Sequence, residues 1–132
     1  MNTTEIDGFQ RLPRRDEKGA INSFNAVDRT IVSEIGLQTA YLSLGVSLRD
    51  QELVGQSIHH GREVLKQYFP HFDALLSLGQ AHALRYALSN SEKERRRAMH
   101  YYEAAERSVF HRPDFSVDFL ISQIRVLREG LL

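Results

Sequence analysis

The chain has 132 residues, in which 17 basic and 17 acidic side chains cancel and cysteine is absent. This length indicates a single domain with its own hydrophobic core. The balanced charge argues against nucleic acid or an anionic membrane as a partner, and the lack of cysteine excludes disulfides and thiolate chemistry.

Residues 1–22 have the composition of a flexible N-terminal tail. They combine Pro13, Gly19 and dense charge with few side chains to bury, so hydrophobic burial does not offset the cost of ordering them. The N-terminus also lacks the layout of a signal peptide, and no apolar run approaches the roughly 20 residues that span a bilayer. We therefore expect a cytoplasmic protein with a single helical domain over residues 23–132.

Helices are expected throughout that domain, because the chain has only three prolines and no alternating pattern typical of strands. The first helical pattern begins at Ser23 or Asn25, both of which are good N-caps. It either splits at Gly36, where glycine costs about 1 kcal/mol relative to alanine, or continues to Arg49.

The later helices are marked by capping residues and prolines. Pro70 and Pro113 end two of them, because proline disfavours a helical conformation in the residue before it. Glu94, three residues after Ser91, completes a capping-box signature. The expected N-caps are Asp50, Asp73, Ser91 and Ser116. Five or six helices follow, the last ending near Gly130.

Two nearly identical stretches, AYLSLG and ALLSLG, end at Gly45 and Gly79. A fixed spacing of this kind is typical of helical repeats. Two antiparallel helices of a hairpin approach closely only where one side chain is almost absent. We therefore expect both glycines to face the partner helix, with Ser57 and Ala98 as the small residues on the other side.

On these positions the chain resembles the tetratricopeptide repeat (TPR) family, whose period of about 34 residues matches the separation of Gly45 from Gly79. Two degenerate units are identified within about residues 38–113. The first comprises Tyr41, Leu44, Gly45, Leu48, Ser57 and Pro70, and the second Leu75, Leu78, Gly79, His82, Ala98, Tyr102, Ala105 and Pro113. The resemblance implies an α–α superhelix of antiparallel hairpins with an extra N-terminal helix and a C-terminal capping helix. The second unit departs from the pattern by an additional stretch at residues 87–95. An ordinary helical bundle, in which the letters recur by chance, is the alternative.

The resemblance also implies a concave groove that holds a helix or an extended peptide of another protein. The corresponding positions are Thr39, Leu42, Val46, Arg49, Asp73, Leu76, Gln80, Ala83 and Leu84. Several are apolar where they are expected to face water. This predicts a protein-binding module, an adaptor or a chaperone, that holds an amphipathic or apolar segment of its partner. A homodimer formed through this row, or around Tyr101, Phe110 and Phe119, is the alternative.

Catalytic and metal-binding patterns are weak. His59 with Glu63, and His100 with Glu103, have spacings that can share a metal, but no H-E-x-x-H motif accompanies them. The chain also lacks a glycine-flanked serine and a phosphate-binding loop. We expect no enzymatic activity, no metal and no other cofactor.

A cluster of arginines at residues 95–97 can contact phosphate. Glu92 and Glu94 lie beside it, which favours a solvated helix start over a nucleic-acid site.

Overall fold

Seven α-helices and one short 3₁₀ helix make up the part of the chain that the computed structural model describes, residues 1–111 and 116–132. They are α1 (Thr3–Arg11), α2 (Glu17–Asn25), α3 (Ile31–Leu48), α4 (Gln51–Gln67), α5 (Phe72–Ser89), α6 (Glu92–Arg107), η1 (Val109–His111) and α7 (Val117–Glu129). These ranges contain no strand, which confirms the all-α class. The five or six helices predicted for residues 23–132 correspond to α3 to α7, and α1 and α2 come in addition. Pro113, predicted to end a helix, lies outside the described residues.

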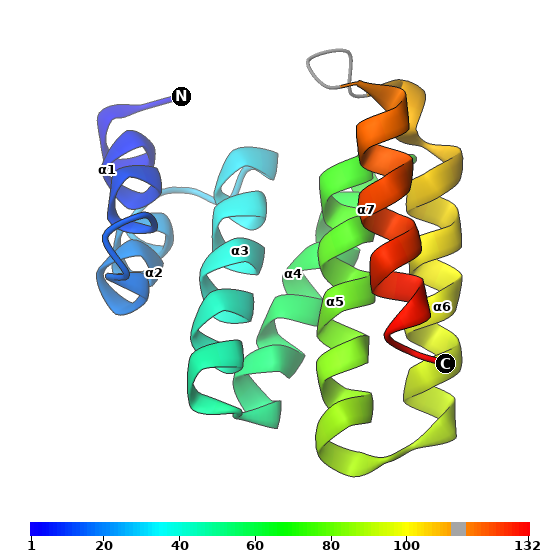
Figure 1. The fold of residues 1–132 in the computed structure, drawn as a ribbon. Helices are drawn as coiled ribbons and strands as arrows, with labels where there is room; N and C mark the ends of the chain where they lie inside the picture. The colour runs from blue at the N-terminus through cyan, green and yellow to red at the C-terminus, as the bar shows by residue number, and fades with distance from the viewer. Residues whose placement is uncertain (112–115) are drawn as a thin grey trace.

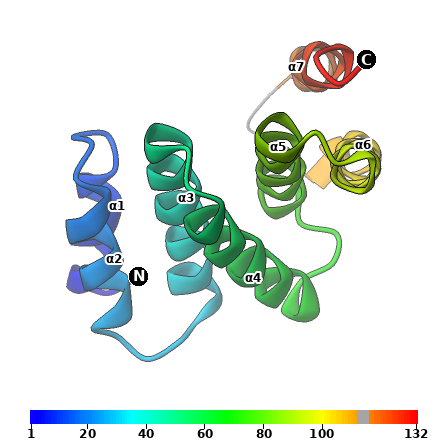
Figure 2. The same cartoon turned by 90° about the horizontal axis from the view of Figure 1, so that it is seen from below.

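The helices pair into three antiparallel hairpins, α1–α2, α3–α4 and α5–α6. Figure 1 shows the hairpins side by side, with the N-terminus at one end of the row and the C-terminus at the other. Viewed end-on in Figure 2, α7 lies over the α5–α6 hairpin on the side away from α4. The row therefore ends in a single unpaired helix.

The segment expected to be a flexible tail forms α1 and most of α2, so this expectation is corrected. Phe24 of α2 is completely buried, and its ring lies between Gly8 of α1 and Gly36 of α3. Phe9 packs edge-to-face on the same ring at 4.8 Å. The apolar side chains of this segment are few, but they gather on one ring in a place that two glycines leave open.

The charge of the segment is also accommodated. The carboxylate of Glu5 accepts hydrogen bonds from the Asn2 backbone and the Thr30 hydroxyl, both at 3.0 Å. The Glu17 carboxylate accepts one from the Ser43 hydroxyl at 2.9 Å. Buried carboxylates cost stability unless they are hydrogen-bonded, and here Thr30 and Ser43 supply partners from α3 and its N-cap. These bonds tie the first hairpin to the second.

The third helix begins later than predicted and does not break. Ser23 and Asn25 lie inside α2, and Thr30 is the N-cap of α3, accepting a hydrogen bond from the Ser33 backbone. The helix runs through Gly36 without interruption, because the missing side chain there admits the Phe24 ring. Glycine at this position serves packing between hairpins.

The other predicted N-caps are partly confirmed. Asp50 and Ser116 accept hydrogen bonds from the first turns of α4 and α7. The fifth helix starts before Asp73, with His71 as its N-cap. Ser91 stands at the N-cap of α6 but makes no side-chain capping bond. The capping box fails because Glu94 binds a histidine of α5 instead.

Gln38 joins three helices in the centre of the row. Its side-chain amide donates to the backbone carbonyl of Ala74 in α5 at 3.1 Å, and its own backbone carbonyl accepts from the Ser57 hydroxyl of α4 at 2.8 Å. Gly61 leaves the space that the Gln38 side chain occupies. Every member of this buried network has a partner, so it specifies how α3, α4 and α5 meet.

Both glycines of the repeated letters lie against the partner helix, as predicted, but the nearest side chains are those of Val54 and Tyr102 instead of the predicted Ser57 and Ala98. A Cβ at Gly45 would lie 2.7 Å from Val54 of α4, and a Cβ at Gly79 would lie 2.5 Å from the Tyr102 ring of α6. The two glycines lie at different positions along their helices, however. Gly45 is near the end of α3, whereas Gly79 is near the middle of α5.

The helices repeat at a longer interval than the letters do. The starts of α3 and α5, Ile31 and Phe72, have the same separation as the starts of α4 and α6. The C-caps of α3 and α5, Arg49 and Asn90, both have a left-handed backbone conformation and are separated by the same number of residues. We call this common separation the hairpin repeat; the interval between the repeated letters is one heptad shorter. Because a heptad makes almost two turns, this shift preserves the helix face but moves a residue about 10 Å along the axis.

The hairpin repeat explains the stretch at residues 87–95 that the shorter register left over. It forms the last turn of α5, the connection at Asn90 and the first turn of α6. No separate loop is inserted there.

By length and composition, α3 is the single helix of the described residues apolar enough to cross a membrane. In this fold it is the central helix of the row, packed against α2, α4 and α5. Its apolar character matches that position.

Candidate functional site

Each of the two larger hairpins contains a buried histidine bound to a glutamate of its partner helix. His60 of α4 lies with Nδ1 2.5 Å from Glu34 of α3, and His82 of α5 lies with Nδ1 2.6 Å from Glu94 of α6. Both histidines are buried, and so is Glu34. These pairs hold the two helices of each hairpin together.

A tyrosine stacks on each histidine in nearly the same geometry. Tyr41 and His60 have ring centroids 5.6 Å apart with planes at 8°, and His82 and Tyr101 are 5.5 Å apart with planes at 9°. Tyr41 is separated from His82 by the hairpin repeat, and so is His60 from Tyr101. The two hairpins therefore have the same stacked pair at equivalent positions, with the two residue types exchanged.

Burial controls the protonation of these histidines. Burial lowers the pKa of His60 and of His82, and the hydrogen bonds to their glutamates only partly offset this. Burial alone raises the pKa of Glu94, but the His82 hydrogen bond and nearby arginines outweigh it, so the pKa of Glu94 is lowered. We therefore assign a neutral imidazole whose Nδ1–H donates to an ionised carboxylate in the His82–Glu94 pair.

Acidification is expected to destabilise the fold below about pH 6.5. In the unfolded chain the histidines protonate near this value, whereas burial keeps them neutral in the folded chain. The unfolded state then binds more protons, so each histidine lowers the free energy of unfolding by up to about 1.4 kcal/mol per pH unit. The loss continues until the pH reaches the folded-state pKa.

Urea unfolding between about pH 7.5 and pH 5.5 measures this dependence. The double variant His60→Gln/His82→Gln should flatten it, whereas His100→Gln, at an exposed histidine outside both pairs, should leave most of it in place. An unaltered slope in the first variant would show that other groups cause the dependence.

The histidine–glutamate pairs considered for metal binding have other partners. Glu63 pairs with Lys66 at 2.8 Å, and Glu103 lies 3.7 Å from Arg128. The His59 ring packs against the His60 ring. Within residues 1–111 and 116–132, no three His, Asp or Glu side chains are placed to hold a metal ion.

The predicted groove residues of α3 form a partly exposed row. Thr39 is exposed, and Val46 is 52% exposed. Leu42 is half-buried against the core cluster of Val54, Ile58, Leu78 and Ala81. Arg49 is exposed at the left-handed end of the helix. These four residues lie on the surface, as predicted, although the half-buried Leu42 side chain also packs against the core.

The predicted groove residues of α5 divide into two groups. Leu76 and Gln80 line a hollow of about 330 Å³ between α5 and α7, whose other walls are Gln123, Val126 and Leu127. Ala83 and Leu84 are half-buried and pack against core clusters. Asp73 is exposed in the first turn. Of the predicted groove residues of α5, only Leu76 and Gln80 line a hollow whose other side is formed by a second helix.

The hollow between α5 and α7 has no charged lining residue. Three of its five side chains are apolar, and two are amides. Val126 projects into solvent and is 68% exposed. The wall contributed by α7 was missed because that helix was expected only to cap the row. The sequence contained one signal for this wall: Val126 is apolar but lies off the helix face on which Leu120 and Ile124 point inward.

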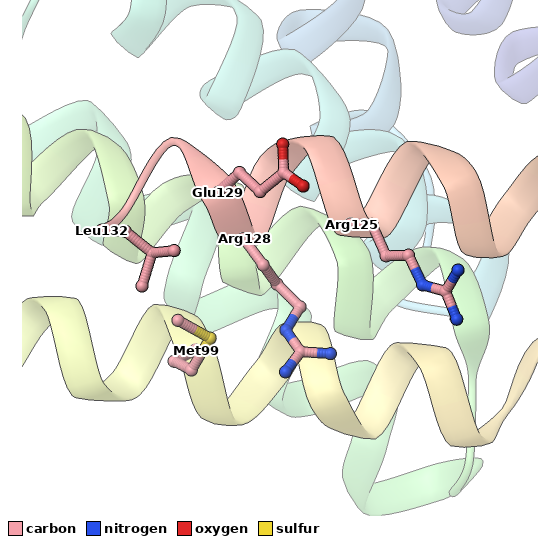
Figure 3. A pocket seen from close by; sticks show the side chains of 5 residues that line it. All are labelled: Met99, Arg125, Arg128, Glu129 and Leu132. Carbon is pink, nitrogen blue, oxygen red and sulfur yellow. The ribbon is translucent and has the colours of Figure 1, made fainter.

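A second hollow, of about 270 Å³, lies between α6 and α7 and differs in chemistry. Its lining residues are Met99, Arg125, Arg128, Glu129 and Leu132. Figure 3 shows Arg128 extending from α7 toward α6, where it pairs with Glu106 at 2.7 Å. This ion pair connects the two helices, so the charged lining contributes to the attachment of α7.

Comparisons of the chain with protein-family models, with curated proteins and with solved structures give no match. Function therefore has to be argued from the geometry of these surfaces.

Proposed function

We propose that the chain binds another protein by seating the apolar face of an amphipathic helix in the hollow between α5 and α7. The observation that carries this proposal is an uncharged hollow bounded by two helices and lined by Leu76, Val126 and Leu127. A third helix fits beside two others by inserting side chains spaced three and four residues apart. The proposed role is that of an adaptor or a chaperone.

The exposed row on α3 extends the proposed surface. Thr39 of α3 is the equivalent of Gln80 of α5 in the hairpin repeat, and Val46 shares that face because it lies one heptad farther along. A partner segment that continues beyond the hollow would meet this row next.

The likeness to the TPR family is part of the proposal. Nested helical hairpins support it. It is weakened by the hairpin repeat, which is one heptad longer than that family's period of about 34 residues.

Peptides selected from a library of random amphipathic sequences against the full chain provide the test. Val126→Glu should weaken their binding at least about tenfold, because an apolar partner side chain would have to desolvate the new carboxylate. The substituted side chain is exposed, so the fold is expected to remain. Fluorescence polarisation of labelled peptides measures the affinity.

Gln56→Glu supplies the control, since Gln56 is exposed on α4, which does not contribute to the hollow. Equal binding to wild-type chain and Val126→Glu would contradict the proposal. Sedimentation at several concentrations addresses the homodimer alternative: a dimer that Val126→Glu dissociates would show that a second copy occupies the hollow.

A further inference from the structure

A basic hollow of about 250 Å³ lies between α4 and α6. Arg62 lines it from α4, and the remaining lining residues come from α6: Lys93, Arg96, Arg97, His100 and Tyr101. Four permanently positive side chains thus face one small volume in a chain whose net charge is zero. A concentration of one charge in a hollow attracts ligands of the opposite charge.

The positive charges of this hollow are mostly uncompensated. Across residues 1–111 and 116–132, Arg62, Lys93 and Arg96 have no carboxylate within ion-pair distance, while Arg97 is 3.4 Å from Glu94. Basic residues nearby but outside the hollow are paired: Arg95 with Glu92, and Lys66 with Glu63. Three of the four cations that face this hollow are therefore without an ion pair.

The repeat itself does not require these charges. In the hairpin repeat, the positions of α4 equivalent to Lys93, Arg96 and Arg97 are occupied by Glu52, Gly55 and Gln56. Helices α4 and α6 have the same place in their hairpins, yet only α6 has a basic face there. The basic residues are thus a feature of this hollow, beyond what hairpin packing demands.

The hollow rests on a rigid wall. Tyr101 stacks on the buried ring of His82, which is bound in turn to Glu94. The other oxygen of Glu94 accepts a hydrogen bond from Arg97. Because these contacts fix Tyr101 and Arg97, little side-chain entropy would be lost when a ligand binds them.

We infer that this hollow binds a single compact phosphate group, as a phosphate ester or a phosphorylated side chain. Guanidinium groups present paired N–H donors that match the oxygens of phosphate. Nucleic acid requires a basic stripe along its backbone, whereas the unpaired cations here face one volume, and Arg95 and Lys66 outside it are paired. The inference is independent of the proposed function, because the α5–α7 hollow contributes no residue to it.

Titration of the ¹⁵N-labelled full chain with inorganic phosphate at constant ionic strength tests the inference. Amide shifts are expected to concentrate around Arg62 and residues 93–101, with a single saturating curve. Arg96→Ala and Arg62→Ala should each weaken binding about tenfold, because each removes a charge-assisted hydrogen bond. Arg95→Ala, at an arginine paired outside the hollow, is the matched control and should change the affinity little.

Further arms distinguish the sources of the phosphate. Phosphoserine peptides that bind more tightly than both inorganic phosphate and the unphosphorylated peptides would identify a protein-borne group. Equal loss in Arg95→Ala and Arg96→Ala would overturn the inference, because it would indicate only general attraction to positive charge. Affinity for single-stranded oligonucleotides that rises with their length, in the absence of saturable phosphate binding, would also overturn it in favour of nucleic acid.

Discussion

Replacing Tyr102 by alanine is expected to lower the free energy of unfolding by about 3–5 kcal/mol, as for other large aromatic side chains removed from cores. Tyr102 is 1% exposed and packs where Gly79 leaves α5 without a side chain. Its ring belongs to the largest buried cluster, which also includes Leu75, Val109 and Ile124. The substitution therefore opens a cavity between α5 and α6 that the surrounding helices fill only partly.

Urea unfolding followed by circular dichroism measures this loss. Phe110→Ala supplies a control, because Phe110 is 77% exposed and its removal should change the stability by less than about 0.5 kcal/mol. Tyr102→Leu, which retains part of the volume, should be less destabilising than alanine. Similar stabilities for Tyr102→Ala and Phe110→Ala would show that α5 and α6 do not meet at Gly79.

Replacing Phe24 by alanine is expected to cost about 3–5 kcal/mol in the attachment of the first hairpin. Its ring is completely buried between Gly8 and Gly36 and is the largest side chain of the cluster that joins α2 to α3. Because this cluster is separate from the cores farther along the row, the loss should open α1 and α2 before the remainder unfolds.

Amide hydrogen exchange resolves this local opening. Protection should fall in residues 3–25 and remain in α4 to α6 in the Phe24→Ala chain. Ile6→Ala, at an exposed position of α1, should leave protection almost unchanged. Rapid exchange of residues 3–25 already in the unsubstituted chain would contradict this account and support the flexible tail predicted from the composition.

The helical class and several boundaries could be predicted because they depend on local chemistry. Asp50 and Ser116 cap helices through hydrogen bonds to residues two or three positions away, which a sequence reveals directly. Glu94 shows the limit of this reasoning. It stands three residues after Ser91, but a buried histidine from α5 binds it more effectively than the backbone does.

The N-terminal hairpin could not be predicted because its stability comes from distant residues. Phe24 is buried through Gly8 and Gly36, and Glu17 finds its hydrogen bond at Ser43. The composition of a segment does not show which packing sites and hydrogen-bond partners other helices provide for it. Few apolar residues suffice where the neighbouring surface already has the matching shape.

The period was misjudged for a related reason. A shift of one heptad leaves every side chain on nearly the same face, so the repeated letters correctly indicated which face of α3 and α5 meets the partner helix. They could not indicate the height along the axis. The longer hairpin repeat is visible in the paired helix starts and in the exchanged Tyr–His stacks.

Part of the candidate site followed from the resemblance to the TPR family. Leu76 and Gln80 were predicted as groove residues and do line a hollow. The opposite wall could not be predicted, because the placement of α7 depends on long-range packing and on pairs such as Arg128 with Glu106.

The central claim, that the hollow between α5 and α7 is a binding surface, is tested most directly by NMR mapping of a selected peptide on the ¹⁵N-labelled full chain. We predict that the largest amide shifts occur at Leu76, Gln80, Gln123, Val126 and Leu127, with smaller shifts at Val46. Shifts confined to α1, α2 or the outer faces of α4 and α6 would contradict the claim.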